Sequence, residues 1–96
     1  MLNQLVVVGR LSKEPIKVDG GVIITLAVPR YYKNKDGIYD TDFISVRLFR
    51  NIAESTLEYC KQGDLVGIKG HIECLSDEPL FLVADKVTFL SSKKED

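Results

Sequence analysis

Aromatic side chains are concentrated in the middle of the chain, and their flat rings could stack on bases. Bases stack on aromatic side chains with a stabilisation of roughly 1–3 kcal/mol each, largely regardless of base identity. The candidates for this role are Tyr31, Tyr32, Tyr39, Phe43 and Phe49. These residues predict stacking platforms for a single-stranded nucleic acid.

Basic side chains are interleaved with these aromatics and could contact the phosphates of the same strand. Lysine and arginine neutralise phosphates and release counterions, which makes such binding strongly dependent on salt. The candidate phosphate contacts are Arg10, Arg30, Lys33, Lys35, Arg47, Arg50 and Lys69.

The net charge of −1 does not by itself indicate a nucleic-acid binder, but the charges are unevenly distributed. Residues 1–50 hold eight Lys and Arg against five Asp and Glu, whereas residues 51–96 hold five against nine. A basic half can give a neutral protein one positive face. Random clustering of solvated charges explains the same distribution equally well.

Packing is the alternative explanation for the aromatic residues. Phe43 and Phe49 could fill a second small core or a subunit contact, and the tyrosines could pack a hairpin. Arg47 lies between the two phenylalanines and is harder to explain by packing, because burying an unpaired cation is costly.

No group of residues in the sequence predicts catalysis. His71 is the only histidine, and the chain has no glycine-rich phosphate loop. Asp40 and Asp42 are explained by turn chemistry and solubility. Cys60 and Cys74 form no CxxC pair and are expected to be small buried hydrophobes. We therefore expect no enzymatic activity, no cofactor and no metal.

The segment from Phe43 to Phe49 shows the clearest strand pattern. Ile44, Val46 and Leu48 alternate with Phe43, Ser45, Arg47 and Phe49. Successive side chains of a strand face opposite sides of the sheet. One face is therefore expected to be aliphatic and buried, and the other to display the aromatics and the arginine.

The other elements can be assigned from composition. A strand is expected at 4–11, where Gly9 indicates a bulge or a sharp bend, and a second at 22–28, stopped by Pro29. The polar residues 30–42 predict a protruding hairpin loop that turns at Asp36-Gly37. A helix is expected at 51–62, capped by Asn51 and Gly63. Strands follow at 64–74, with Ile72 on its buried face, and at 80–90, joined by a short turn at 76–79.

This order predicts an all-β fold, a five-stranded OB-fold barrel with one helix between strands three and four. Residues 1–91 would form the domain and 92–96 a short polar tail. No apolar run approaches the ~20 residues of a membrane span, and no signal peptide is recognisable. A cytoplasmic, nucleoid-associated protein is therefore expected.

Several segments give the chain a resemblance to the DNA-binding domain of bacterial-type single-stranded DNA-binding proteins. They occur in family order and spacing: Asn3–Leu11, Glu14-Pro15, Ile24–Val28, Asp42–Phe49, Ala53-Glu54, Glu58-Tyr59, Lys61–Gly70 and Val83–Leu90. Each segment is weak alone, but together they are specific.

The resemblance implies a homo-oligomer, with a tetramer favoured over a dimer, that wraps single-stranded DNA during replication, recombination or repair. Family stacking positions fall on Tyr32, Phe43 and Phe49, and basic positions on Arg10, Lys33 and Arg47.

The chain departs from the family pattern in three ways. It has no tryptophan, it has a short loop between the last two strands, and it lacks the acidic tail that recruits partner proteins. The resemblance leaves one alternative, a primosome-type OB module that acts mainly through protein contacts.

Overall fold

Seven short elements make up the fold of this chain, whose computed structural model describes residues 1–75 and 78–92. The elements are β1 (Leu5–Leu11), β2 (Ile16–Val18), β3 (Gly21–Lys33), β4 (Tyr39–Leu48), α1 (Arg50–Tyr59), β5 (Leu65–Leu75) and β6 (Glu78–Ser91). Part of the expected turn at 76–79 and most of the expected tail lie outside the described residues.

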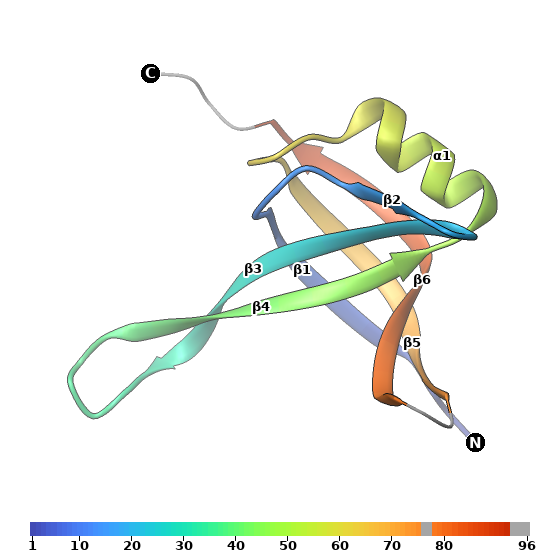
Figure 1. The fold of residues 1–96 in the computed structure, drawn as a ribbon. Helices are drawn as coiled ribbons and strands as arrows, with labels where there is room; N and C mark the ends of the chain where they lie inside the picture. Colours follow the sequence, from blue (N-terminus) through green and yellow to red (C-terminus); the bar gives the residue numbers. More distant parts are fainter. Residues whose placement is uncertain (76–77, 93–96) are drawn as a thin grey trace.

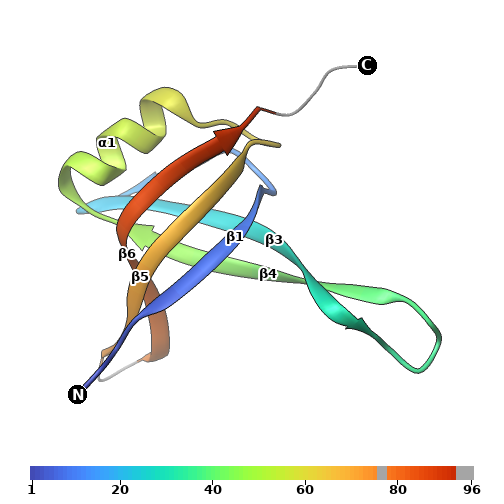
Figure 2. The same ribbon diagram turned by 180° about the vertical axis from the view of Figure 1, so that it is seen from behind.

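Five strands close into a barrel because β1 pairs with both β5 and β3. Around the ring the order is β1, β5, β6, β4 and β3. The β4–β6 pairing is parallel, and the other pairings are antiparallel. The helix α1 lies across one end of the barrel (Figures 1 and 2). This arrangement confirms the predicted OB-fold barrel with a helix between the third and fourth barrel strands.

Aliphatic side chains from every barrel strand fill the interior. Val46 and Leu48 of β4 are fully buried, and Ile44 packs against the same core, so the predicted two-faced strand is confirmed. Ile24 and Leu26 of β3 meet them from the neighbouring strand. Each fully buried side chain of this size stabilises the fold by roughly 1.5–3 kcal/mol.

Gly9 marks a close approach between strands, and of the two features expected there, a bulge or a sharp bend, the bulge is wrong. β1 keeps a continuous register with β5 from Leu5 to Arg10. A Cβ atom at Gly9 would lie 2.7 Å from the carbonyl oxygen of Ala27 on β3. Only glycine therefore allows β1 to pass this close to β3 where the barrel closes.

The prediction that a strand stops at Pro29 was wrong. β3 runs on to Lys33, because Pro29 still pairs with Thr41 and the ladder becomes irregular only beyond it. The missing amide of the proline thus falls beside an irregularity, where its loss is tolerated. The short strand β2, which pairs with the start of β3, was also not predicted.

The helix begins and ends earlier than predicted. Phe49 is its N-cap residue and makes no side-chain cap, and Cys60 is its C-cap, so neither Asn51 nor Gly63 has the expected role. Arg50 adopts a φ of 55°, a left-handed conformation that is uncommon for a residue with a side chain. The chain therefore turns sharply out of β4 directly into α1.

Among the described residues, no helix is long and apolar enough to cross a membrane.

Two burial predictions also need correction. Cys60 is buried as expected, but Cys74 is exposed. Ile72 was expected on the buried face of β5 with Val66 and Ile68, yet it is 40% exposed. Both exposed residues lie beyond the irregularity in the β5–β6 register at Lys69 and Gly70.

Candidate nucleic-acid interface

The hairpin formed by β3 and β4 extends well beyond the barrel (Figure 1). We call its outer part, residues 29–42, the arm. Its turn is fixed by Asn34, whose Oδ1 accepts hydrogen bonds from the amides of Asp36 (2.8 Å) and Ile38 (3.0 Å). Gly37 has a φ of 79°, which glycine adopts without strain. The predicted Asp-Gly turn is confirmed.

The ladder between the two arm strands is interrupted next to the barrel. Pro29 pairs with Thr41, and the next pair joins Lys33 to Tyr39. Three residues of β3 therefore face one residue of β4. Such a bulge bends and twists a hairpin. Here side-chain contacts add to the backbone pairing of the arm.

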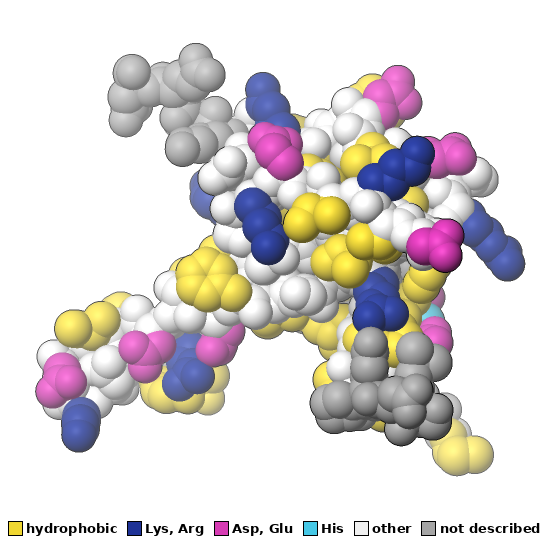
Figure 3. All heavy atoms as spheres, viewed as in Figure 1, with side chains coloured by type: hydrophobic (Ala, Val, Ile, Leu, Met, Phe, Trp, Pro, Cys, Tyr) yellow, Lys and Arg dark blue, Asp and Glu magenta, His cyan; other side chains and the backbone are white. Residues whose placement is uncertain are grey.

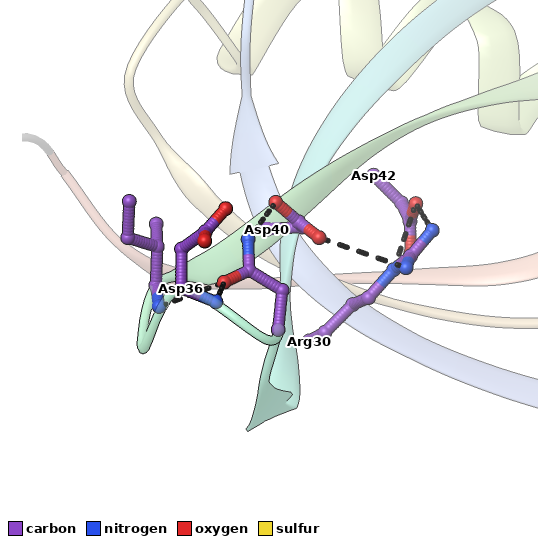
Figure 4. Close-up of polar contacts among 6 residues, drawn as sticks. Arg30, Asp36, Asp40 and Asp42 are labelled. Carbon is purple, nitrogen blue, oxygen red and sulfur yellow. Dashed lines mark hydrogen bonds and ion pairs between the residues drawn. The ribbon is translucent and has the colours of Figure 1, made fainter.

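Arg30, the first residue of this bulge, directs its guanidinium group at two carboxylates of β4 (Figure 4). Its Nε and Nη2 donate to the Asp42 carboxylate at distances of 3.0–3.3 Å, and its Nη1 lies 3.8 Å from Oδ2 of Asp40. The hydrogen bonds to Asp42 raise the pKa of Arg30, and those from Arg30 lower the pKa of Asp42. Asp40 and Asp42, which the sequence analysis explained by turn chemistry and solubility, are thus partners of Arg30.

The tyrosines of the arm are exposed. Tyr31 is 94% exposed, and its ring meets that of Tyr32 edge-on, with centroids 5.1 Å apart. The Arg30 guanidinium lies 6.0 Å from the Tyr32 ring centroid, and the Lys33 ammonium lies 5.7 Å from that of Tyr39. Figure 3 shows the arm carrying hydrophobic side chains among charges of both signs. The structure therefore brings the predicted aromatic and basic residues of the arm together.

The outer face of β4 continues from the arm onto the barrel. Phe43 is 67% exposed, and Phe49, just past the strand, is 40% exposed. At the rise of a β-strand, these two positions are roughly 20 Å apart. Ser45 and Arg47 lie between them on the same face.

Arg10 joins this face through the closure of the barrel. It pairs with Ala27 of β3, and Ala27 pairs with Phe43 of β4. Two strand spacings place the Arg10 and Phe43 positions about 10 Å apart. A cation from β1 therefore flanks the most exposed phenylalanine of β4. Nη1 of Arg10 also donates to the carbonyl oxygen of Gly63 at 3.0 Å, which orients the side chain.

Phe81 is an aromatic residue of this face that the sequence did not single out. The Arg47 guanidinium lies 4.3 Å from its ring centroid. Such a cation–π contact stabilises by about 0.5–1 kcal/mol at exposed sites. The residues meet because β4 and β6 pair in parallel near Arg47 and Val83. Arg47 and Phe49 also line one surface cavity of about 250 Å³.

The remaining predicted cations are more scattered. Lys35 is exposed at the end of the arm, and Arg50 is exposed at the start of α1. Lys69 pairs with Val6 and Lys86, so it lies across β6 from β4. The structure does not bring Lys69 to the arm.

His71 lies between two carboxylates on the outside of β5 and β6. Its Nδ1 is 3.0 Å from Asp85 and its Nε2 is 2.6 Å from Glu73. The hydrogen bonds to Asp85 and then Glu73 raise the pKa of His71. The carboxylates contact opposite sides of the ring, and no group of ligands within the described ranges could hold a metal ion.

Comparison with known proteins places the chain in a defined group. Residues 2–78 match the family described as "Single-strand binding protein family". The chain is 37% identical to "Single-stranded DNA-binding protein B" of Bacillus subtilis (strain 168), covering 97% of this chain and 94% of that protein. It is 38% identical to "Single-stranded DNA-binding protein 2" of Staphylococcus aureus (strain COL), covering 97% and 76%.

Two solved structures share the fold. The small single-stranded DNA-binding protein from Streptomyces coelicolor matches with a TM-score of 0.73 and 21% identity, over 94% of this chain and 96% of that chain. A mitochondrial single-stranded DNA-binding protein from S. cerevisiae matches with a TM-score of 0.74 and 20% identity, over 96% and 99%. At these identities the likeness concerns the barrel itself.

Proposed function

This chain belongs to the single-strand binding protein family, and on that premise we propose that it binds single-stranded DNA without catalysis. Binding would be largely independent of sequence and would serve replication, recombination or repair in the cytoplasm, at the nucleoid. The observation that carries the proposal is the run of exposed aromatic rings from the arm to the end of β4. Rings this exposed leave apolar surface in water, which stacked bases would cover.

The stacking residues of the proposed site are those predicted from the sequence. Phe43 and Phe49 would stack on the barrel, and Tyr31, Tyr32 and Tyr39 would stack on the arm. Single strands fit such a surface because their bases are free to stack, whereas the bases of a duplex are already stacked and paired.

The cations beside these rings would meet the phosphates. Arg10 flanks Phe43, Lys33 lies over Tyr39, and Arg47 lies between the two phenylalanines. Lys35 and Arg50 extend this set, and Lys69 is a more distant member. Arg30 was also predicted to meet phosphate, but its guanidinium is hydrogen-bonded to Asp42.

The test measures the affinity of the chain for labelled oligo(dT) and for a duplex of matched length at two salt concentrations. We expect the single strand to bind more tightly, with an affinity that falls as salt rises. Phe43→Ala should weaken binding, while Phe89→Ala, which removes an exposed phenylalanine next to α1, should not. Equal binding of the two DNA forms at low salt would refute the proposal.

We also propose that the chain forms a homo-oligomer, with a tetramer favoured over a dimer, and that β1 contributes to the contact. From Leu5 to Gly9, β1 pairs only with β5 within the described part of the chain. Val6 and Val8 of this segment are exposed by 71% and 47%. An unpaired edge with apolar side chains favours pairing with a second chain.

Val6→Glu tests this contact by sedimentation velocity. We expect the variant to sediment as a smaller species, because the carboxylate would be buried without a partner. Lys13→Glu, which introduces the same group on the exposed segment after β1, should leave the assembly unchanged. A monomeric wild-type chain at micromolar concentration would contradict this proposal.

A further inference from the structure

Arg30 was predicted to contact phosphate, yet its hydrogen-bonding groups face protein carboxylates. Nε and Nη2 are occupied by Asp42, and Nη1 is directed toward Asp40. A bidentate arginine–carboxylate pair is stronger and more directional than a contact to a lysine ammonium. A phosphate that took the place of Asp42 at Nε and Nη2 would break this pair and leave a carboxylate facing the DNA, and the remaining Nη1 has the Asp40 carboxylate 3.8 Å away.

The pair lies at the irregular part of the β3–β4 ladder. Between the Pro29–Thr41 and Lys33–Tyr39 pairs, three residues of β3 lie opposite the single residue Asp40 of β4. The Arg30–Asp42 contact connects the first residue of the bulge to Asp42, which pairs with Val28 on the barrel side. Asp40 lies 3.8 Å from Nη1 of Arg30 and accepts a hydrogen bond from Nδ2 of Asn34 at 3.2 Å. A chain of side-chain contacts thus connects the barrel end of the arm to its turn.

Tyr31 and Tyr32 are two of the three residues in the bulge, and Arg30 is the third. The guanidinium lies near the Tyr32 ring, whose edge-on contact with Tyr31 connects the second ring to the same assembly. Neither ring is packed in the core, so their arrangement in the free protein depends on these contacts.

We propose that Arg30 is a positioning residue. Held by Asp42 and Asp40 at the barrel end of the bulge, it fixes the arm so that Tyr31 and Tyr32 meet DNA in one arrangement, and it does not contact phosphate itself. The inference rests on the proposed function for its effect on binding, but its effect on the free arm is independent of DNA.

Asp42→Asn gives the first test, because a simple charge effect and the positioning role predict opposite changes in the affinity for oligo(dT). Removing a negative charge near DNA should raise affinity if Asp42 merely competes with phosphate for Arg30. The positioning role predicts that affinity for oligo(dT) falls about 3- to 10-fold, since the tyrosines must then be immobilised on binding. Asp36→Asn, which removes the same charge from the same arm without breaking an ion pair, is the matched control and should not weaken binding. Asp42→Asn binding as tightly as Asp36→Asn would overturn the inference.

Arg30→Lys separates geometry from charge. A lysine keeps the cation but cannot form the bidentate pair, so we expect it to weaken binding as much as Asp42→Asn does. Wild-type affinity in this variant would indicate a charge contact to phosphate and would overturn the inference. In a Tyr32→Ala background, Asp42→Asn should cost little further affinity, whereas the full, additive loss would show that Asp42 does not act through the tyrosine.

The free protein supplies a readout that needs no DNA. In ¹⁵N relaxation measurements, the amides of Tyr31 and Tyr32 should have order parameters of about 0.85 in the wild type and below about 0.6 in Asp42→Asn. The amide of Leu26, in the core of the same strand, should be rigid in both. Equal order at the tyrosines in both proteins would refute the positioning role, even if single-stranded DNA binds as proposed. If the wild type fails to bind DNA, the proposed function is lost, and the relaxation data alone decide the role of Arg30.

Discussion

The barrel and the arm are parts of the same two strands, but different interactions hold them in place. In the barrel, β3 and β4 contribute Leu26 and Leu48, which are completely buried. In the arm, the same strands have exposed side chains, an interrupted ladder and an ion pair at Arg30. We therefore expect stability to reside in the barrel and substitutions in the arm to cost little folding free energy.

Core truncation gives the largest expected effect and contrasts the two regions directly. Leu26→Ala removes a side chain with 0% exposure and should lower the free energy of unfolding by about 2–5 kcal/mol. Tyr31→Ala, on the same strand but in the arm, should change it by less than about 0.5 kcal/mol. Urea denaturation followed by circular dichroism measures both values. A similar loss in the two variants would mean that the arm belongs to the folding core.

Phe49 lies at the boundary between structure and binding, because it occupies the N-cap position of α1 and also displays its ring. We expect Phe49→Ala to lose about 1–3 kcal/mol of affinity for oligo(dT) while its circular dichroism spectrum stays that of the wild type. Phe49→Tyr keeps the ring and should bind nearly as well. Unchanged affinity in the alanine variant would place Phe49 among the packing residues.

His71 offers the smallest effect, a pH dependence of barrel stability. Its contacts with Asp85 and Glu73 raise its pKa in the folded protein above the ordinary 6.5. The contribution to stability is therefore complete below pH 6.5 and is lost as pH rises through the raised pKa. Stability of the wild type relative to His71→Gln should be larger at pH 5.5 than at pH 9, as measured by thermal unfolding. A difference that grows with pH would contradict this assignment.

The sequence predicted those features that depend on neighbouring residues. The alternation of Ile44, Val46 and Leu48 follows from the strand period, and the turn at Gly37 follows from the conformational freedom of glycine. Both depend on local geometry alone, so they could be recognised without knowledge of the tertiary structure.

Features that depend on strands distant in the sequence were not predictable. The Arg47–Phe81 contact requires the parallel β4–β6 pairing, and the row of Arg10, Ala27 and Phe43 requires barrel closure. The Arg30–Asp42 contact was not predicted, because nothing in the sequence reveals the bulge at Arg30. A basic residue near aromatic residues looks the same in the sequence whether it contacts a phosphate or a carboxylate.

The parallel pairing of β4 with β6 has a kinetic consequence. The β3–β4 hairpin closes through a short turn and can form within about 1–10 μs, as local hairpins do. The barrel can close only after β5 has paired with β1 and β6 has paired with β4. Folds dominated by such distant pairings form in milliseconds to seconds. The arm and its turn should therefore be among the first parts of the chain to become ordered, and the core that supports them among the last.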